Sequence, residues 1–352
     1  MGLSSFSVDH FRCLKHVSLD FHPGHNLIWG HNASGKTSLL EAVFLLGRGR
    51  SFRTRSSERL IQHGQERLVV FGRTDEPLSR ALGVQVSRGA ETIAKIDGSF
   101  VSSLAELSRA FAVQVIEPGV HRLIEEGGHR RRRWLDWGVF HVEPGFIDTW
   151  SMYTRALKQR NASLKTQPEF ADAWDLELIR LGESIAQSRE QFLDQLRPHW
   201  IQTISALTDL QMELHYSRGW AQGISLAEAL EAAHGRDRQR GTTHVGPHRA
   251  DVSLRSQGKL ARDVLSRGQQ KMAAIALILS QLSLLKQVAG LTPTLLLDDP
   301  AAELDRVRLK RFTTQVSELS CQLIVTALSS DLDPLGIPDR AFHVEQGEVQ
   351  LV

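Results

Sequence analysis

The stretch Gly30-His31-Asn32-Ala33-Ser34-Gly35-Lys36-Thr37 decides the fold of this chain. It fits the phosphate-loop pattern G-x-x-x-x-G-K-[ST] in full. The glycines let the backbone curl until successive N–H groups face one side, where they can surround an anion. A helix beginning at this point adds open N–H groups and the positive end of its dipole. The stretch therefore predicts a site for ATP, in which Lys36 meets the β- and γ-phosphates and the Thr37 hydroxyl binds Mg²⁺.

The segments beside this loop have the context that it requires. Leu27-Ile28-Trp29 reads as a short buried strand leading into it, and a helical pattern of apolar residues follows from Thr37. Further strands are expected over residues 5–29 and 68–98, with a hairpin turn at Asp97-Gly98. The residues assigned to ATP in this stretch are Gly30, His31, Asn32, Ala33, Ser34, Gly35, Lys36, Thr37 and Ser38.

A metal-holding carboxylate follows a second apolar run, Leu295-Leu296-Leu297-Asp298-Asp299. Such a run is typical of a central strand buried on both faces, and Asp298 at its carboxyl end is the expected Mg²⁺ partner of Thr37. Asp299 could polarise the attacking water, with Lys36 as the second catalytic group, or support the metal site without acting as a base. Many related ATPases have glutamate here. The shorter aspartate favours slow hydrolysis, with ATP as a switch rather than a fuel.

The segment Leu265-Ser266-Arg267-Gly268-Gln269-Gln270-Lys271 precedes another helical pattern and resembles the signature motif of ABC-type ATPases. In that motif, a serine and a glycine at a helix N-terminus contact the γ-phosphate held by the opposite subunit. A serine before a helix is common by itself. Its position about 30 residues before the Asp298 strand makes the assignment of Ser266, Gly268 and Gln269 specific.

The residues after that strand, Ala301-Ala302-Glu303-Leu304-Asp305, resemble the D-loop, which crosses the subunit interface in the same ATPases. We assign Glu303 and Asp305 to it. One chain with one phosphate loop and one signature cannot complete its own site, whereas two chains placed head-to-tail complete two. The sequence therefore predicts an ATP-dependent homodimer.

About 260 residues separate the phosphate loop from Asp298, far more than in compact proteins of this kind. Helical periodicity over residues 146–212, with Pro168 between two long antiparallel helices, marks the inserted part. Residues 233–244 are polar and read as an exposed loop. We expect an α/β fold: an ABC-type ATPase head with a mixed β-sheet flanked by helices, plus an inserted, mainly helical second lobe. The expected parts are residues 1–125 and 245–352 for the ATPase lobe and 126–244 for the insert.

The net charge is only +2, so local clusters are more informative than the total. The arginines after the phosphate-loop helix are the best DNA-binding candidates, although an intramolecular or nucleotide-facing role is the alternative; those assigned are Arg48, Arg50, Arg53 and Arg55. The run Arg130 to Arg133 could also meet phosphates. Trp134 and Trp137 beside it could stack on bases or anchor the segment in the core.

The composition, with 41% hydrophobic and 23% charged residues, is that of a globular protein. The two cysteines are too few for a disulfide framework and fit a reducing compartment. No apolar run approaches the ~18 residues of a membrane span, and the first residues lack a signal-peptide pattern. We therefore expect a cytoplasmic protein with no membrane partner.

Nearly the whole chain resembles the RecF family of bacterial recombination mediators, which are related to SMC proteins. The stretches that carry this resemblance are Phe11-Arg12, Leu40-Glu41-Ala42, Gly49-Arg50-Ser51-Phe52-Arg53-Thr54, Arg131-Arg132-Arg133-Trp134-Leu135-Asp136-Trp137-Gly138, Ala156 to Asn161, and Gly246-Pro247-His248-Arg249-Ala250-Asp251. The family usually has a second aspartate where Ala250 stands. The resemblance also implies a two-lobe ATPase without the long coiled coil of SMC proteins.

The resemblance implies ATP-dependent dimerisation on DNA, single-stranded, duplex or at gap junctions, with weak DNA-stimulated ATPase activity. It further implies help for RecR, with RecO, in loading RecA during repair, replication restart and the SOS response. Arg12 would lie near the adenine base. Gln114, on a segment similar to the Q-loop, would sense the γ-phosphate beside Mg²⁺. No histidine switch follows the strand expected at Leu323 to Thr326.

Two other function classes are possible. The ATPase subunit of a membrane transporter shares the phosphate loop and signature, but the Phe11-Arg12 start and the helical insert argue against it. A DNA-cutting enzyme would need a carboxylate and histidine cluster outside the ATP site, and the sequence has none. His244 and His248 are separated by Pro247, which disfavours a zinc site on one helical face.

Overall fold

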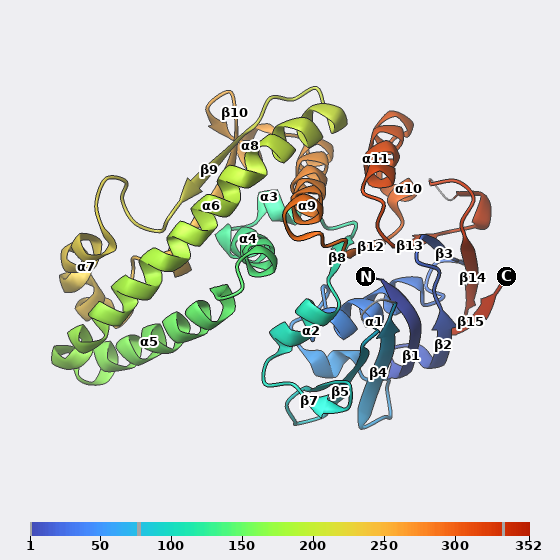
Figure 1. Cartoon of the computed structure of the whole chain (residues 1–352), viewed down its shortest axis with the longest axis horizontal. Coiled ribbons are helices and arrows are strands. Elements are labelled where there is room, and N and C mark those ends of the chain that lie inside the picture. The colour runs from blue at the N-terminus through green and yellow to red at the C-terminus, as the bar shows by residue number, and fades with distance from the viewer. Residues whose placement is uncertain (1, 76–78, 333–334) are drawn as a thin grey trace. The chain divides into compact units, whose positions relative to one another are not determined.

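The computed structural model describes residues 2–75, 79–332 and 335–352 (Figure 1). These residues form two compact units. The first unit comprises Met1–Val120 and Gly290–Val352, and the second unit comprises His121–Ala289. The phosphate loop and the Asp298 strand both lie in the first unit, although most of the chain separates them in sequence.

The first unit contains a six-stranded antiparallel sheet. Its strands, in spatial order, are β2 (Leu14–Asp20), β1 (Leu3–Phe11), β4 (Arg67–Thr74), β5 (Ala81–Ser87), β6 (Ile93–Ile96) and β7 (Ser99–Phe100). Asp97 and Gly98 join β6 to β7 with φ of 50° and 83°, the left-handed backbone of a two-residue hairpin turn. The hairpin predicted at Asp97-Gly98 is confirmed.

The same unit contains a second sheet, which positions the site. Its strands, in spatial order, are β15 (Glu348–Leu351), β14 (Arg340–Glu345), β3 (His25–Trp29), β13 (Leu323–Ala327), β12 (Thr294–Leu297) and β8 (Val113–Ile116). All neighbours are parallel except β14 and β15. The carboxyl ends of β3, β13 and β12 therefore lie side by side at one edge, as in other parallel sheets that bind ligands there.

Helix α1 (Lys36–Arg48) lies in the core of the first unit. Eleven of its residues are buried, and its apolar side chains pack with residues of both sheets. Smaller elements complete the unit: η1 (Ser57–Leu60), α2 (Leu104–Ala110), α10 (Pro300–Glu303), α11 (Arg306–Glu318) and η4 (Ser330–Leu332). The predicted α/β class, with a mixed sheet flanked by helices, is confirmed.

The second unit is mainly helical, with one three-stranded sheet in the order β11-β10-β9. Its elements are α3 (Arg122–Glu125), α4 (Gly128–Val142), α5 (Phe146–Thr166), η2 (Pro168–Trp174), α6 (Asp175–Leu207), β9 (Glu213–Ser217), α7 (Leu226–Arg240), η3 (Pro247–Arg249), β10 (Asp251–Ser256), β11 (Lys259–Leu260), α8 (Ala261–Val264) and α9 (Arg267–Ala289). Figure 1 shows α5 and α6 running side by side as a long pair. As predicted, the chain breaks at Pro168 between these two helices.

The sequence reading of residues 233–244 as an exposed loop is wrong. Helix α7 covers most of them, begins with a capping box between Ser225 and Glu228, and buries a short apolar face that includes Leu230. Asp237 is also fully buried. The polar remainder of this helix and Gly235 concealed its periodicity.

The compact units divide the chain at points different from the expected lobes. Residues 245–289, which we expected in the ATPase lobe, belong to the second unit because α9 packs along α6. Helix α9 is also the one described helix long and apolar enough to cross a membrane by length and composition. However, 72% of its most apolar window is buried, as in a core helix.

Candidate nucleotide site and signature helix

The phosphate loop has the curled backbone that its sequence predicts. Gly30 and Gly35 have φ of 155° and 121°, where side chains other than hydrogen are strained. A Cβ atom at Gly30 would lie 2.2 Å from the carbonyl oxygen of Val344, so only glycine fits. The Lys36 ammonium lies inside the curl and donates to the carbonyls of Gly30 (2.6 Å) and His31 (2.9 Å). Burial lowers the pKa of Lys36, while the charges of Asp299 and Asp298 oppose that shift.

The two halves of the site meet at Thr37 and Asp298. The Thr37 hydroxyl donates to the Asp298 carboxylate, 2.9 Å from Oδ1 and 3.2 Å from Oδ2. This contact follows from the sheet, because β13 lies between β3, which leads to the phosphate loop, and β12, which ends before Asp298. The predicted Thr37 and Asp298 pair is therefore brought together at the carboxyl edge.

Thr326, on the middle strand β13, is a part of the site that sequence reasoning missed. Its hydroxyl donates to Oδ1 of Asp298 (3.0 Å) and accepts from the backbone N–H of Asp299 (2.9 Å). A threonine inside an apolar strand gives no signal by itself. Only the parallel pairing of β13 with β12 places it beside the two aspartates.

The residues around this contact fit a metal-bound nucleotide. The Thr37 hydroxyl and Asp298 carboxylate are the hard oxygen donors that Mg²⁺ prefers. Burial raises the pKa of Asp298, and the hydrogen bonds from Thr37 and Thr326 oppose this shift. The buried Ser34 hydroxyl has no hydrogen-bond partner among the described residues, as expected of a group that faces a phosphate oxygen.

Asp299 adopts a left-handed backbone, with φ of 48° and ψ of 55°, and immediately precedes the helix α10. Pro300 occupies the first turn of that helix, a position where its missing N–H costs nothing. The negative charge of Asp299 acts on Lys36 across the site. Whether Asp299 acts as the base or only supports the metal site stays a prediction.

A buried carboxylate, Glu41, binds the Arg12 side chain. Glu41 is not among the site residues that the sequence predicts. Glu41 of α1 is fully buried, and it accepts from Arg12 at 2.6 Å (Nε) and 3.0 Å (Nη2). The Ser51 hydroxyl also donates to Glu41, and Nη1 of Arg53 lies 3.7 Å from it. Glu41 therefore ties the β1–β2 turn and the segment after α1 to the phosphate-loop helix.

The candidate DNA-binding arginines are placed in different environments. Arg53 is paired with Glu41, and its charge opposes the rise in the pKa of Asp298. Arg53 therefore has an intramolecular contact, and its role toward DNA stays a prediction. Arg48 is half-buried with its guanidinium 5.5 Å from the Phe44 ring centroid. Arg50 and Arg55 are exposed.

Gln114 is not brought to the Thr37 and Asp298 contact. It lies within β8 opposite Leu295, whereas the backbone of Asp298 bonds to Ile116. At ~3.3 Å per residue, Gln114 is about 10 Å back from the level of Asp298 along the strands. Its predicted role beside Mg²⁺ therefore has no support from the register.

The signature residues form the start of α9 in the second unit. The backbone N–H of Ser266 donates to Oε1 of Gln269 (2.9 Å), and Oγ of Ser266 accepts from the N–H of Gln269 (3.3 Å). This reciprocal capping box fixes the helix terminus. Ser266 is exposed and Gly268 is half-buried in the first turn. The helix start is therefore capped, and its serine is exposed.

Asp305, which we assign to the D-loop, lies at the start of a helix in the structure. Its side chain accepts from the backbone N–H groups of Val307 and Arg308, so Asp305 caps the helix α11. Glu303 ends α10, and its side chain lies outside the described part of the structure. Their predicted contact with a second subunit stays a prediction.

Within the arginine run at residues 130–133, the members differ in burial. Arg131 is buried and makes a two-pronged pair with Asp251, at 2.9 and 3.0 Å. It also donates to the carbonyls of three residues before α4. Arg130 pairs with Glu126, and Arg132 donates to the Ala250 carbonyl. Trp134 and Trp137 are buried, which matches core anchoring rather than base stacking.

The other stretches of the predicted family pattern also form buried contacts. Asp136 pairs with the fully buried Arg189, whose Nη1 donates to the Pro247 carbonyl at 2.7 Å. Arg160 is fully buried between Asp175 and Asp237. In each of these pairs, loss of one member would leave a buried charge without its partner.

The two histidines near residue 246 make contacts within the protein. His244 contacts Asp237 at 2.8 Å, and His248 contacts the Tyr153 hydroxyl at 2.7 Å and the Thr243 carbonyl at 3.1 Å. Among the described residues, no group of three His, Cys, Asp or Glu side chains could hold a metal ion.

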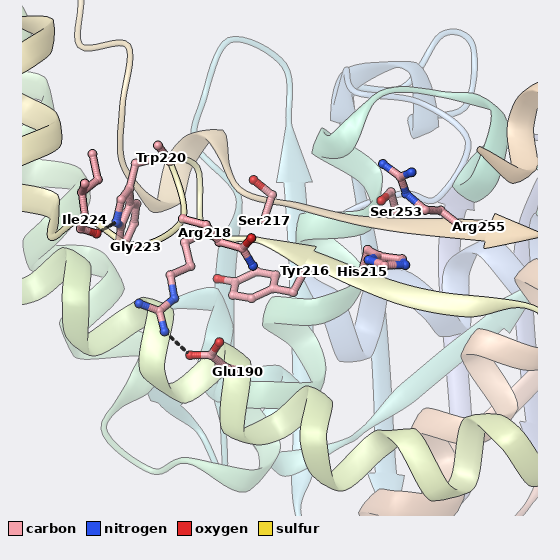
Figure 2. A pocket seen from close by; sticks show the side chains of 12 residues that line it. Glu190, His215, Tyr216, Ser217, Arg218, Trp220, Gly223, Ile224, Ser253 and Arg255 are labelled. Carbon is pink, nitrogen blue, oxygen red and sulfur yellow. Dashed lines mark hydrogen bonds and ion pairs between the residues drawn. The ribbon is translucent and has the colours of Figure 1, made fainter. Parts of the chain in front are cut away.

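A cavity of about 450 Å³ lies in the second unit, beside β9 and the segment that follows it. Figure 2 shows Arg218 paired with Glu190 at its wall, with Tyr216 and Trp220 nearby. None of the residues assigned to ATP, Mg²⁺ or the signature lines it. The cavity is therefore separate from the predicted nucleotide chemistry.

Comparisons with known proteins agree with this geometry. The family described as RecF/RecN/SMC N terminal domain matches residues 2–334. The DNA replication and repair protein RecF of Xanthomonas euvesicatoria pv. vesicatoria (strain 85-10) is 42% identical over 357 residues, covering 96% of each chain. RecF of Stenotrophomonas maltophilia (strain R551-3) is 40% identical over 367 residues, covering 100% of both.

Solved structures give the same picture. A structure described as the recombination mediator protein RecF-ATP in the RecFOR pathway has a TM-score of 0.90 and 28% identity, covering 100% of this chain and 97% of that one. The SMC head bound to the C-terminal winged-helix domain of ScpA has a TM-score of 0.60 at 14% identity, covering 100% and 97%. The second likeness shows the fold alone.

Proposed function

The chain belongs to the RecF family of DNA replication and repair proteins, and on that premise we propose that it binds ATP with Mg²⁺ and uses them to join two copies of itself on DNA. The observation that carries the proposal is the contact between Thr37 and Asp298 beside the curled phosphate loop. ATP is supported further by the related RecF structure described with ATP. When bound, Mg²⁺ would neutralise phosphate charge between these two oxygen donors.

The residues of the chain divide the work at this site. The loop N–H groups and Lys36 would hold the phosphates, and Lys36 would exchange its bonds to the Gly30 and His31 carbonyls for phosphate oxygens. Arg12, fixed by Glu41, would lie toward the base. Asp299 is the candidate for orienting water, and its short side chain favours slow hydrolysis. Membership of the RecF family adds the expectation that DNA stimulates this hydrolysis.

The homodimer follows from how the two anion-binding helix termini are distributed. The start of α1 carries the phosphate loop in the first unit, and the capped start of α9 carries Ser266 in the second. We infer that Ser266, Gly268 and Gln269 of one copy close on the γ-phosphate held by the other. The segment with Asp305 would lie at the same interface.

DNA is the proposed partner of the dimer. Arg53 is paired with Glu41 and Arg48 is half-buried, so the exposed Arg50 and Arg55 are the better phosphate ligands among the assigned arginines. In the pathway, the dimer would act at gaps with RecR and RecO and promote RecA loading in repair, replication restart and the SOS response, in the cytoplasm. A transporter subunit is not retained, because the relatives named above are DNA replication and repair proteins over their full length.

Sedimentation velocity with and without MgATP tests the proposal. The wild type should shift from monomer to dimer with MgATP, while Lys36→Met and Ser266→Arg should remain monomeric. Asp172→Asn, an exposed carboxylate of the second unit outside the site, is the control and should dimerise normally. A wild type whose sedimentation ignores MgATP would exclude the ATP-joined dimer.

A further inference from the structure

The outer face of the antiparallel sheet is built differently from its inner face. Along β4, the inward side chains of Leu68 and Val70 are fully buried, whereas Arg67, Phe71 and Arg73 alternate with them and are exposed. The same alternation continues through β5 and β6. Figure 1 labels β4, β5 and β7 in the first unit, and β6 lies between β5 and β7 in the sheet.

One row of residues crosses four strands of this outer face. Phe71 pairs with Gly83, Gly83 with Lys95, and Lys95 with Phe100. Phe71 is 39% exposed and Phe100 is 71% exposed, and these exposed fractions are unusually high for phenylalanine. The Lys95 ammonium lies 4.4 Å from the Phe100 ring centroid. We call these four residues the Phe71–Phe100 row.

The middle of the row is open. An added Cβ atom at Gly83 would meet only the Phe71 ring, at 4.0 Å. Two exposed rings therefore stand at the ends of a shelf with no side chain at Gly83. At about 4.8 Å per strand spacing, the two ends are roughly 14 Å apart. A single strand that keeps the stacked rise of duplex DNA, about 3.4 Å per nucleotide, would place about four nucleotides along it.

The charged side chains within strands β4 to β7 are all positive. Strands β4 to β7 contain Arg67, Arg73 and Lys95 and no aspartate or glutamate. All three cations occupy outward positions in the alternation, on the same face as the two rings. Rings that accept any base by stacking, with interleaved cations for the phosphates, are the features of surfaces that bind single strands.

We propose that the Phe71–Phe100 row is a platform for single-stranded DNA, with unpaired bases stacked on Phe71 and Phe100 and phosphates on Lys95, Arg67 and Arg73. The inference rests on the proposed DNA-binding function and adds a surface separate from Arg50 and Arg55. Duplex DNA would gain little from it, because paired bases do not expose their faces to a ring. The platform would therefore give preference for the single-stranded part of a gap.

Fluorescence anisotropy with labelled oligo-dT and with a duplex tests this inference on the full chain. Phe71→Ala with Phe100→Ala should weaken oligo-dT binding at least about tenfold, since each stacked base lost costs a factor of roughly five or more. Duplex binding and MgATP-dependent dimerisation should be unchanged. Phe170→Ala, an aromatic that is 60% exposed in the second unit, is the matched control and should bind like the wild type.

A second variant reports stacking directly. Phe100→Trp keeps a ring at the site, so it should bind oligo-dT at least as well as the wild type, and its added indole emission should be quenched on binding. Unchanged oligo-dT affinity in the double alanine variant would overturn the platform and leave the face as a protein contact. If the wild type binds neither the duplex nor oligo-dT, the proposed DNA-binding function itself is wrong.

Discussion

The hydroxyl of Thr37 lies 2.9 Å from Oδ1 of Asp298, although 261 residues separate the two in sequence. The contact exists because β3 and β12 end at the same edge of a parallel sheet, with β13 between them. Thr326 of β13 donates to the same oxygen at 3.0 Å. Hydrogen bonds within the protein therefore hold the Asp298 carboxylate in place without a metal ion.

Asp298→Asn should separate metal binding from folding. Asparagine keeps an acceptor oxygen for both threonines and removes the charge. Because burial raises the pKa of Asp298, its charge destabilises the folded chain, and this cost develops as the pH rises from the ordinary value through the raised one. Without nucleotide, the variant should melt at or above the wild-type temperature.

With MgATP, the same variant should lose the gain in stability that the wild type shows. That gain is about 2.7 kcal/mol when ATP is present at 100 times its dissociation constant. Scanning calorimetry with and without MgATP measures both effects. Equal stabilisation of variant and wild type would exclude Asp298 as the metal partner.

Arg12→Ala should destabilise the chain more than Arg53→Ala, although both arginines contact Glu41. Arg12 makes two hydrogen bonds to this fully buried carboxylate, and removing one partner of a buried pair costs about 3–5 kcal/mol. Arg53 is 44% exposed and 3.7 Å away, so its loss should cost under about 1 kcal/mol. Urea denaturation gives both values, and similar costs would contradict the role of Arg12 in holding Glu41.

Loss of the Arg131 side chain should lower the free energy of unfolding much more than loss of the neighbouring Arg130 side chain. Arg131→Ala leaves Asp251 and three carbonyls without their donor and should cost about 3–5 kcal/mol. Arg130→Ala breaks an exposed pair with Glu126 and should cost under about 1 kcal/mol. Urea denaturation of both variants checks the difference. A stable Arg131→Ala chain with weakened DNA binding would restore the arginine run as a DNA surface.

Stability should depend on His248 below neutral pH. Burial lowers the pKa of His248 to about 4, while Nδ1 accepts from Tyr153 and Nε2 donates to the Thr243 carbonyl. The unfolded chain, with the ordinary pKa of 6.5, binds the proton more readily, so stability falls as the pH drops from 6.5 toward 4. We expect a loss of about 2 kcal/mol between pH 8 and pH 5 from this group.

His248→Gln removes the titrating group and should flatten this part of the pH profile. Urea denaturation of variant and wild type at pH 5, 6.5 and 8 makes the comparison. The variant will be less stable overall, so the slope with pH is the informative quantity. Parallel profiles would show that His248 titrates normally in the folded chain.

The phosphate loop, Asp298 and the break at Pro168 could be predicted because each depends on a short motif with fixed local geometry. Contacts set by distant segments could not. The run at residues 130–133 looks like a cationic surface until Asp251, 120 residues later, is seen against Arg131. Thr326 gains its role only through strand order.

Helix α7 was missed because its apolar face is short and most of its residues are polar, although the spacing of Ser225 and Glu228 is a capping-box signal. The likeness of its segment to the Q-loop predicts a role for Gln114 beside Mg²⁺, whereas the register of β8 places Gln114 back from the level of Asp298. Local patterns therefore predicted elements and motifs, whereas tertiary pairing decided which polar residues face the site.

Mixing two inactive variants tests the central claim, that one copy completes the ATP site of the other. Lys36→Met damages the phosphate loop, and Ser266→Arg damages the signature at the start of α9. In a head-to-tail pair of one copy of each, one of the two sites has both parts intact. Sedimentation velocity with MgATP should therefore show a dimer in the mixture that neither variant forms alone. A mixture that stays monomeric while the wild type dimerises, or a Ser266→Arg variant that dimerises by itself, would contradict the shared site.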